Sequence, residues 1–214
     1  MARKAVAAPG QAPKTLVIAC GALANEILAI TAQAGLANLE LTCLPAIWHN
    51  TPDRIPAGVR DKIRAARGRY DRILVAYGDC GTGGRLDRVL AEESVERIGG
   101  PHCYAFFSGV ADFLARADGD PTCFYLTDYL ARHFDRLIIE GLGLDRHPEL
   151  LADYFGNYTK LIYLRQTEDR TLESAARRAA ARLGLAYDSR FTGYGDLERF
   201  LTTRAAGDGA VDRP

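Results

Sequence analysis

The sequence has no excess of charge of either sign. Its 214 residues include 27 Lys and Arg against 27 Asp and Glu, so the formal net charge at neutral pH is zero. Proteins that bind nucleic acids or anionic membranes owe much of their affinity to an excess of positive charge. We therefore expect neither a nucleic acid nor a membrane among the partners of this chain.

Long apolar runs are also missing. No run approaches the roughly 20 residues that a membrane-spanning helix needs, and the segment around Arg3 and Lys4 has no apolar core of a signal peptide. The cysteines number five, an odd count, and a chain of this size does not depend on disulfides for stability. These features predict a cytoplasmic protein with free thiols.

Short apolar runs alternate with longer segments of helical periodicity. Thr15–Cys20 is apolar at almost every position, which is typical of a strand buried on both faces. Alternation of this kind predicts parallel strands joined by helical crossovers. The strands that we expect are Thr15–Cys20, Leu39–Pro45, Arg72–Tyr77, Val95–Ile98, Lys160–Arg165 and Leu185–Phe191.

The fold class predicted is α/β and Rossmann-like, with a mainly parallel sheet and helices on both faces. We expect a single α/β domain over residues 15–204, in which residues from about 103 to 158 form a helical cap region. That region includes a helical stretch that runs from Pro121 towards Ile139. Residues 1–14 and 205–214 are expected to be flexible tails.

Four residues with metal-binding or nucleophilic side chains stand where expected strands end. Cys20 is the last residue of the first strand, and His49, Cys80 and Cys103 follow the next three strands. Ligands of open α/β sheets bind at the carboxyl ends of the strands, so we expect these side chains to meet at one edge. Thiolates and imidazole suit zinc, iron or an iron–sulfur cluster, although the sequence has no C-x-x-C pair.

The loop from residue 78 to residue 84, GDCGTGG, lies between a strand and a helix. Backbone N–H groups of such a loop can approach an anion at the start of the helix, but the GKS/T ending of a P-loop is missing. We expect the loop to stabilise the thiolate of Cys80, and Asp79 to orient a histidine or bind substrate. A tight turn is the simpler reading. The glycines predicted to bind a cofactor are Gly78, Gly81, Gly83 and Gly84.

Three functions fit this pattern. The first is a metal protein with the four residues as ligands, and the second is a metal-free enzyme. In the second, Cys20 and Cys80 act as an acid/base pair, or one cysteine is a nucleophile with His49 as its base. The third is a module that holds an anion or a nucleotide in the 78–84 loop, with the cysteines as ordinary core or loop residues.

The remaining assignments concern catalysis and assembly. The catalytic candidates are Cys80, Asp79 and Glu26, of which Glu26 lies in the helix after Cys20. Cys43 and Cys123 fall within secondary structure and are expected to be structural. We expect a small-molecule substrate, and a homodimer as the default assembly.

Several short motifs resemble one known family. The resemblance covers about residues 15–203 and is to domain-of-unknown-function family 1638, which implies no settled activity. It implies corrinoid-dependent methyl-transfer proteins as candidate partners, and a metal- or thiol-dependent transferase, because zinc-bound thiolates are common in methyl transfer. The motifs are the Cys-Gly end of the first strand, Leu44–Pro52, Tyr77–Gly84, Cys103-Tyr104, Leu126–Asp128, Gly141–Leu144 and Tyr154–Tyr158.

Overall fold

The structure is a computed structural model in which residues 13–117 and 121–205 are described. Of the tails predicted at 1–14 and 205–214, only residues 13, 14 and 205 lie within the described part. None of the helices in these two ranges has the length and apolar character that a membrane crossing requires.

The chain forms two compact units. One comprises residues 1–106 together with 196–214, and the other comprises residues 107–195. A compact unit is a domain only if it folds alone, so the single domain expected over residues 15–204 stays a prediction. The α/β class, the parallel pairing and the helices on both sheet faces are confirmed, but the strands form two sheets.

The first unit is built on a four-stranded parallel sheet with the strand order β2-β1-β3-β4. The chain moves from β1 outward to β2 and then returns to the other side of β1 for β3. The strand order therefore reverses between β1 and β3, which is where ligands of such sheets usually bind. The strands are β1 Thr15–Cys20, β2 Leu39–Leu44, β3 Arg72–Ala76 and β4 Glu96–Arg97.

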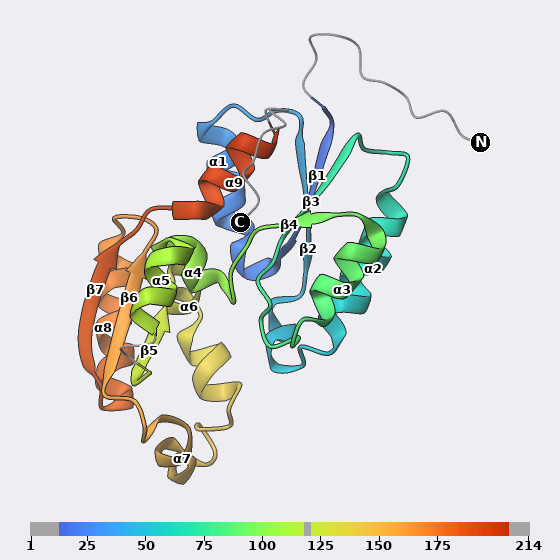
Figure 1. The fold of residues 1–214 in the computed structure, drawn as a ribbon. Helices are drawn as coiled ribbons and strands as arrows, with labels where there is room; N and C mark the ends of the chain where they lie inside the picture. Colours follow the sequence, from blue (N-terminus) through green and yellow to red (C-terminus); the bar gives the residue numbers. More distant parts are fainter. Residues whose placement is uncertain (1–12, 118–120, 206–214) are drawn as a thin grey trace. The chain divides into compact units, whose positions relative to one another are not determined.

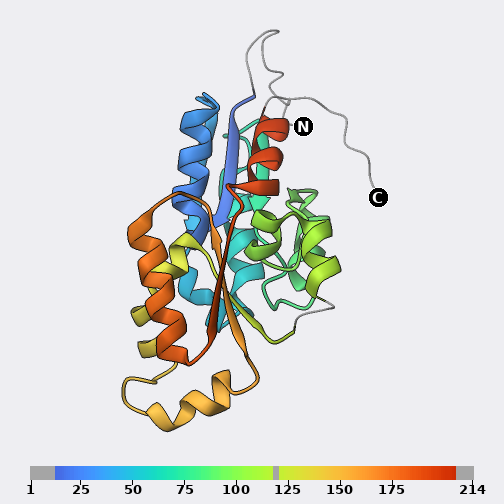
Figure 2. The same cartoon turned by 90° about the vertical axis from the view of Figure 1, so that its left-hand side faces the viewer.

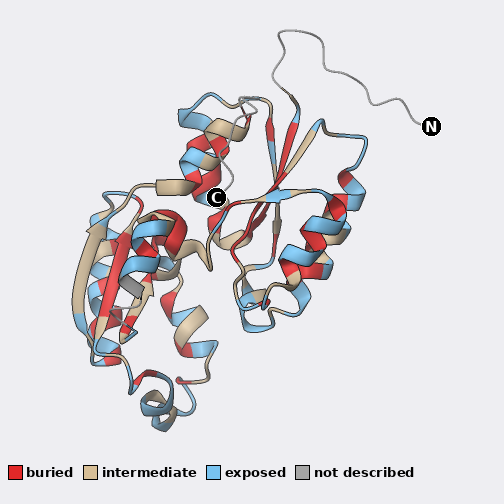
Figure 3. Ribbon diagram, viewed as in Figure 1, coloured by how far each residue is buried: buried red, intermediate tan, exposed pale blue. Residues whose placement is uncertain are grey.

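Helices cover both faces of this sheet. Figure 1 shows α2 and α3 on one face and α1 and α9 on the other. Buried residues concentrate along β1 and β3 and on the helix faces that turn towards them (Figure 3). The helices are α1 Ala24–Gln33, α2 Arg54–Ala66, α3 Arg85–Glu93 and α9 Gly195–Ala205, with short helices η1 Gly21–Leu23 and η2 Ala46–Asn50. The helix α4 Cys103–Ser108 begins in this unit, and the boundary between the units falls within it.

The second unit has a three-stranded parallel sheet with the order β5-β6-β7. Figure 2 shows α8 on one face of this sheet and α5 on the other. The strands are β5 Cys123–Leu126, β6 Lys160–Arg165 and β7 Ala186–Phe191. The helices are α5 Val110–Ala117, α6 Asp128–Arg132, the π-helix η3 Asp135–Glu140, η4 Pro148–Leu150, α7 Leu151–Phe155 and α8 Arg170–Leu183.

The prediction of a helical stretch from Pro121 towards Ile139 was wrong in its first part. Residues 123–126 form β5, which pairs with β6 along its whole length. The segment Cys-Phe-Tyr-Leu is rich in residues that favour strands, and its pairing partner lies more than 30 residues further along the chain. The region expected to be a helical cap therefore contains a sheet strand.

A buried carboxylate fixes the end of β5 to the end of β6. Asp128 is 3% exposed and accepts hydrogen bonds from the Tyr163 hydroxyl at 2.6 Å and from the backbone N–H of Gln166 at 3.1 Å. The backbone N–H and the hydroxyl of Thr167 donate to it at 3.0 Å and 2.6 Å. A buried charge is stable only when it is satisfied in this way.

In the first unit, Glu93 ties α3 to α2. Its side chain is buried and contacts Arg64 Nε at 2.8 Å and Arg67 Nη2 at 2.9 Å. The guanidinium groups of Arg67 and then Arg64 hold the pKa of Glu93 below its ordinary value of 4.5. Ionised Glu93 is therefore a connection between the two helices that cover one sheet face.

Replacing Glu93 with Gln should lower the thermal unfolding temperature at neutral pH, because both guanidinium groups lose their carboxylate partner. The folded-state pKa is depressed, so the stabilisation is complete above pH 4.5 and is lost as the pH falls through the folded-state pKa. The gap in unfolding temperature between wild type and variant should narrow in acid. The matched control is Glu92→Gln, which removes an exposed pair with Arg60 and should change little at any pH. A gap that remains unchanged at about pH 3 would contradict this assignment.

Candidate functional site

The four residues expected to be metal ligands line one small cavity in the first unit. Cys20 ends β1, His49 lies in η2 after β2, Cys80 lies in the loop after β3, and Cys103 begins α4 after β4. The cavity measures about 10 Å³, which is room for about one water molecule or one monatomic ion. The remaining walls include the side chains of Leu23, Tyr77 and Phe106.

His49 forms the outer wall of this cavity and is exposed on its solvent side. Its Nδ1 atom lies 3.1 Å from the carbonyl oxygen of Ala46 and 3.8 Å from Sγ of Cys20. A carbonyl oxygen only accepts hydrogen bonds, so Nδ1 carries the hydrogen in this arrangement. The other ring nitrogen, Nε2, is then the one that could bind a metal once it has lost its proton.

The side chain of Cys20 is buried and accepts a backbone hydrogen bond. The residue is 3% exposed, and its Sγ accepts a hydrogen bond of 3.4 Å from the backbone N–H of Ala22 at the start of η1. The position at the reversal of strand order therefore carries a buried sulfur that a backbone N–H holds from one side.

Cys80 has an uncommon backbone conformation. Its φ angle is +48°, in the left-handed region that residues with a side chain seldom adopt. The Cys80 N–H donates to the carbonyl of Pro101 at 2.8 Å. Strained residues of this kind persist only where their surroundings fix them, and they often occur at functional sites.

The backbone contact that fixes Cys80 requires glycine at position 78. A β-carbon there would lie 2.7 Å from Cα of His102 and 2.8 Å from the carbonyl oxygen of Pro101. The loop after β3 is therefore packed backbone to backbone against the segment before α4. This packing brings Cys80 close to Cys103.

The carboxylate of Asp79 accepts hydrogen bonds from its own glycine-rich loop. Its carboxylate accepts hydrogen bonds from the Thr82 hydroxyl at 2.7 Å, from Gly84 N–H at 2.8 Å and from Gly83 N–H at 3.1 Å. Burial opposes its ionisation, but these hydrogen bonds together lower the pKa of Asp79. Two of the glycines expected to bind a cofactor thus donate to Asp79. The carboxylate is directed into the loop rather than towards a histidine.

The thiols and the imidazole shift one another's ionisation. Hydrogen bonding to Cys20, and then to Cys80, raises the pKa of His49 to about 11. Burial, and then the charges of Cys80, Cys20 and Glu26, raise the pKa of Cys103 well above its ordinary value. The arrangement therefore favours the protonated imidazole of His49 and the neutral thiol of Cys103.

Glu26 and Tyr77 complete the surroundings of the site. Glu26 is 6% exposed in α1, and its charge is one of the causes that raise the pKa of Cys103. Burial, and then the charge of Cys20, raise the pKa of Tyr77. The Tyr77 hydroxyl has no hydrogen-bond partner of ordinary geometry among residues 13–117 and 121–205.

Tyr77 was not among the expected site residues, because its place in the site depends on the register between β1 and β3. Ala76 pairs with Ala19 in the sheet, so the next residue, Tyr77, falls opposite Cys20. Because side chains alternate between the two faces of a sheet, Tyr77 and Cys20 are directed to the same face. By the same register, Cys43 is opposite Ala19 and is directed to the other face.

Neither Cys43 nor Cys123 lines the cavity. Cys43 is half-buried in β2, and Cys123 is 6% exposed in β5. With the side chains as they lie, no group of three or more His, Cys, Asp or Glu among the described residues has the spacing of a metal site. The four ligand candidates share a cavity, but they do not yet surround a common point.

A family model matches the chain. The model of a family described as "Protein of unknown function (DUF1638)" matches residues 43–201, which is most of the chain. His49, Cys80 and Cys103 lie within the matched range, whereas Cys20 precedes it. No curated protein matches the chain.

Replacing Gly78 with Ala should destabilise the first unit, because the new methyl group must displace the backbone of Pro101 and His102. Overpacking of this kind costs about 1–3 kcal/mol, measurable as a lower unfolding temperature. Gly99→Ala is the matched control, since a β-carbon at position 99 meets nothing within 4 Å. Equal stability of the two variants would show that the close backbone contact does not form.

Proposed function

This chain belongs to the protein family DUF1638, and we propose that it is a metal-binding protein. Its ligands are Cys20, His49, Cys80 and Cys103. The metal is zinc, with iron or an iron–sulfur centre as the next candidates. One observation carries the proposal. Three thiols and an imidazole from four separate strand connections line a cavity with room for about one ion.

The donor set supports a transition metal over magnesium or calcium. Three sulfurs and one nitrogen form a typical tetrahedral zinc site, and thiolate selects soft or borderline metals. Magnesium and calcium prefer oxygen ligands. In the cavity lining, the oxygen-bearing side chain is the phenol of Tyr77, and the carboxylate of Asp79 is committed to its own loop.

The surroundings of His49 also support metal binding. Histidines that bind metals usually donate their second ring N–H to a carboxylate or a backbone carbonyl, which fixes the ring. The carbonyl of Ala46 accepts from Nδ1 at 3.1 Å, so Nε2 would be the metal-binding nitrogen. Because His49 is exposed on its outer side, it would also be the ligand past which an ion enters.

Metal binding needs a rearrangement of side chains, because the present spacing does not surround one point. Thiol side chains turn about a single bond, so rotation of the cysteine side chains is the rearrangement that binding would need. Binding would expel a proton from His49 and from Cys103, whose pKa values are both raised. The gain from binding must exceed the cost of losing those protons.

The role of the site in catalysis follows from its size. A bound metal would supply Lewis acidity that activates a thiol or a water molecule. The cavity has no space for an organic molecule, so a substrate would approach from the His49 side. A small thiol or methyl donor is the candidate substrate class, with corrinoid-dependent methyl-transfer proteins as candidate partners.

Protein purified without oxygen should contain about one equivalent of zinc or iron per chain, and the metal-free protein should regain it. Each of Cys20→Ser, Cys80→Ser and Cys103→Ser should weaken Zn²⁺ binding by about 100-fold or more in a chelator competition, since each removes a ligand. Affinity should rise between about pH 6 and pH 8, because binding releases protons.

The matched control for these variants is Cys43→Ser, which removes a half-buried thiol on the other sheet face. It should leave Zn²⁺ affinity unchanged. Less than about a tenth of an equivalent of metal, together with no uptake on addition, would exclude the metal site. A loss in Cys43→Ser as large as in Cys20→Ser would show that the ligands are assigned wrongly.

A second candidate function is metal-free thiol chemistry. It is favoured by the raised pKa of His49, caused by Cys20 and Cys80, and by the strained backbone of Cys80. A thiolate beside an imidazolium is the pairing that activates cysteine nucleophiles. Cys103, as a neutral thiol, would then be the nearby proton donor.

Iodoacetamide labelling separates the two candidates. In metal-free protein, Cys80 should react faster than Cys43, which is similarly half-buried, and His49→Gln should slow Cys80 by about tenfold or more. Zinc should protect Cys80 if the first proposal holds and should have no effect if the second does. Slow and equal labelling of both cysteines, unaffected by His49→Gln, would count against a thiol–imidazole pair.

A further inference from the structure

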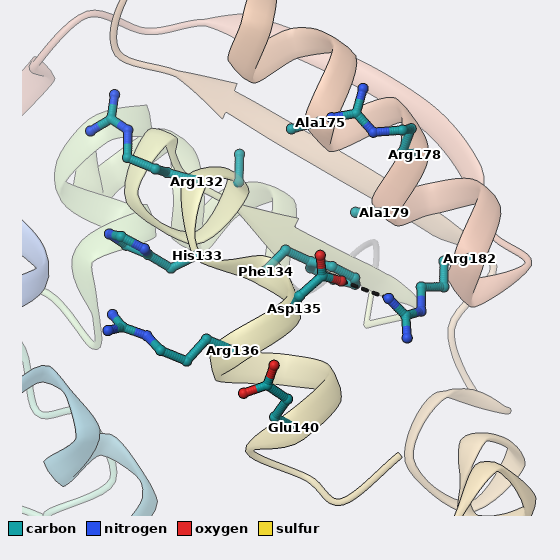
Figure 4. Close-up of a pocket in the computed structure, with 11 residues that line it drawn as sticks. Arg132, His133, Phe134, Asp135, Arg136, Glu140, Ala175, Arg178, Ala179 and Arg182 are labelled. Atoms are coloured by element: carbon teal, nitrogen blue, oxygen red, sulfur yellow. Dashed lines mark hydrogen bonds and ion pairs between the residues drawn. The ribbon is translucent and has the colours of Figure 1, made fainter. Parts of the chain in front are cut away.

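The second unit contains a pocket of about 580 Å³ between the segment from α6 to η3 and the facing side of α8 (Figure 4). Its charged side chains do not converge on one point. Figure 4 shows the side chains of Arg132 and Arg136 extending away from α8 and from Arg178. Asp135 and Arg182 are paired with each other at 2.6 Å. The polar groups of this pocket are therefore dispersed or already paired, and a more informative polar group lies in the first unit.

That group is the hydroxyl of Tyr77, which belongs to the lining of the small cavity that the proposed metal ligands share. Tyr77 is 1% exposed, and its hydroxyl has no hydrogen-bond partner of ordinary geometry within residues 13–117 and 121–205. A buried polar group without a partner lowers the stability of a protein. Such a group can be explained by a catalytic role or by an ion that belongs beside it.

The sheet places this hydroxyl beside Cys20. Ala76 pairs with Ala19, so the next residues, Tyr77 and Cys20, are opposite each other and direct their side chains to one face. Burial, and then the charge of Cys20 and hydrogen bonding with it, raise the pKa of Tyr77. The hydroxyl and the sulfur are therefore neighbours, although the geometry between them is not that of an ordinary hydrogen bond.

The aromatic ring that carries the hydroxyl is held in place. It is buried in the core of the first unit, and it lies nearly parallel to the imidazole of His49, with the ring centroids 6.4 Å apart and an angle of 20° between the planes. Because the ring is held, the hydroxyl stays near the sulfur of Cys20. A turn of the Cys20 side chain about its single bond would change the geometry between the two groups.

A cysteine sulfur that binds a metal needs hydrogen-bond donors. The metal ligand is the thiolate, and a buried charge is costly unless it is hydrogen-bonded. The backbone N–H of Ala22 is one donor to Cys20, at 3.4 Å. The phenol of Tyr77, in the same cavity lining, can supply a second. Donors of this kind orient metal ligands and adjust the affinity of the site.

We propose that the Tyr77 hydroxyl donates a hydrogen bond to the sulfur of Cys20 when that sulfur binds a metal, which makes Tyr77 a positioning residue of the site. The inference rests on the proposed metal ligands and adds to them a residue that does not touch the metal. Metal binding then satisfies two groups together, the charged sulfur and the phenol beside it. Tyr77 should therefore matter for metal affinity and not for the stability of the metal-free protein.

Tyr77→Phe removes the hydroxyl and keeps the ring. In the metal-free protein its unfolding temperature should equal or exceed that of wild type, because no hydrogen bond is lost. Its Zn²⁺ affinity in a chelator competition should be about 10- to 100-fold lower. With Co²⁺ in place of zinc, the sulfur-to-metal charge-transfer band should move to longer wavelength, because a thiolate that loses a hydrogen bond gives up electron density more easily.

Two other Tyr→Phe replacements are matched controls. The Tyr187 hydroxyl, in the second unit, is also buried without a partner of ordinary geometry among the described residues, so Tyr187→Phe should leave the affinity and the band unchanged. The Tyr163 hydroxyl donates to Asp128 at 2.6 Å, so Tyr163→Phe should lower the unfolding temperature of the metal-free protein. A loss of stability in Tyr77→Phe as large as in Tyr163→Phe would show that its hydroxyl is already bonded, and would overturn the proposal.

The role of Tyr77 and the metal site itself can fail separately. If wild type binds metal and Tyr77→Phe leaves either the affinity or the band unchanged, the role of Tyr77 is overturned and the ligands stand. Equal losses of affinity in Tyr77→Phe and Tyr187→Phe would also overturn it, because the effect would not be local to the site. Wild type that binds neither Zn²⁺ nor Co²⁺ would overturn both proposals.

Discussion

The candidate site depends on one contact between two stretches of backbone. Gly78 lies so close to Pro101 and His102 that a single methyl group would not fit between them. Through this contact the N–H of Cys80 reaches the carbonyl of Pro101, which holds Cys80 in a conformation that an isolated loop would leave. The same contact sets where α4 begins and hence where Cys103 enters the cavity. Cys20 and His49 then need only the ordinary ends of β1 and β2 to reach the same place.

The apolar pattern of the sequence predicted the strands whose ends are marked by neighbouring residues. β1 and β6 begin and end where expected, and β2 and β3 end one residue earlier, because their apolar runs and flanking residues are distinctive. The shared edge of Cys20, His49, Cys80 and Cys103 follows from parallel topology alone. β5 and the separation into two sheets could not be predicted in this way, because they depend on a strand pairing across more than 30 residues. The commitment of Asp79 to its own loop was also missed, since the sequence does not show where a carboxylate points.

Both units use a carboxylate directly after a strand to organise the following turn. Asp79 accepts from the N–H groups that precede α3, and Asp128 accepts from the segment that follows β6. In each case carboxylate oxygens accept hydrogen bonds from backbone donors near the carboxyl ends of the strands. The two carboxylates differ in what they join, because Asp79 closes the loop that contains Cys80, whereas Asp128 joins two strands that are distant in the sequence. The thiol site is thus supported by electrostatics that are internal to its own loop.

The hydrogen bonds that Asp79 accepts within its own loop affect how readily that loop can bind other anions. A glycine-rich turn before a helix ordinarily competes for whatever anion the solution contains, and phosphate is abundant inside cells. In this loop the carboxylate of Asp79 already occupies the donors. An incoming anion would have to displace it, and because Asp79 belongs to the same chain its effective concentration is high. The N–H groups of Gly83 and Gly84 are therefore already engaged by a carboxylate of the same chain.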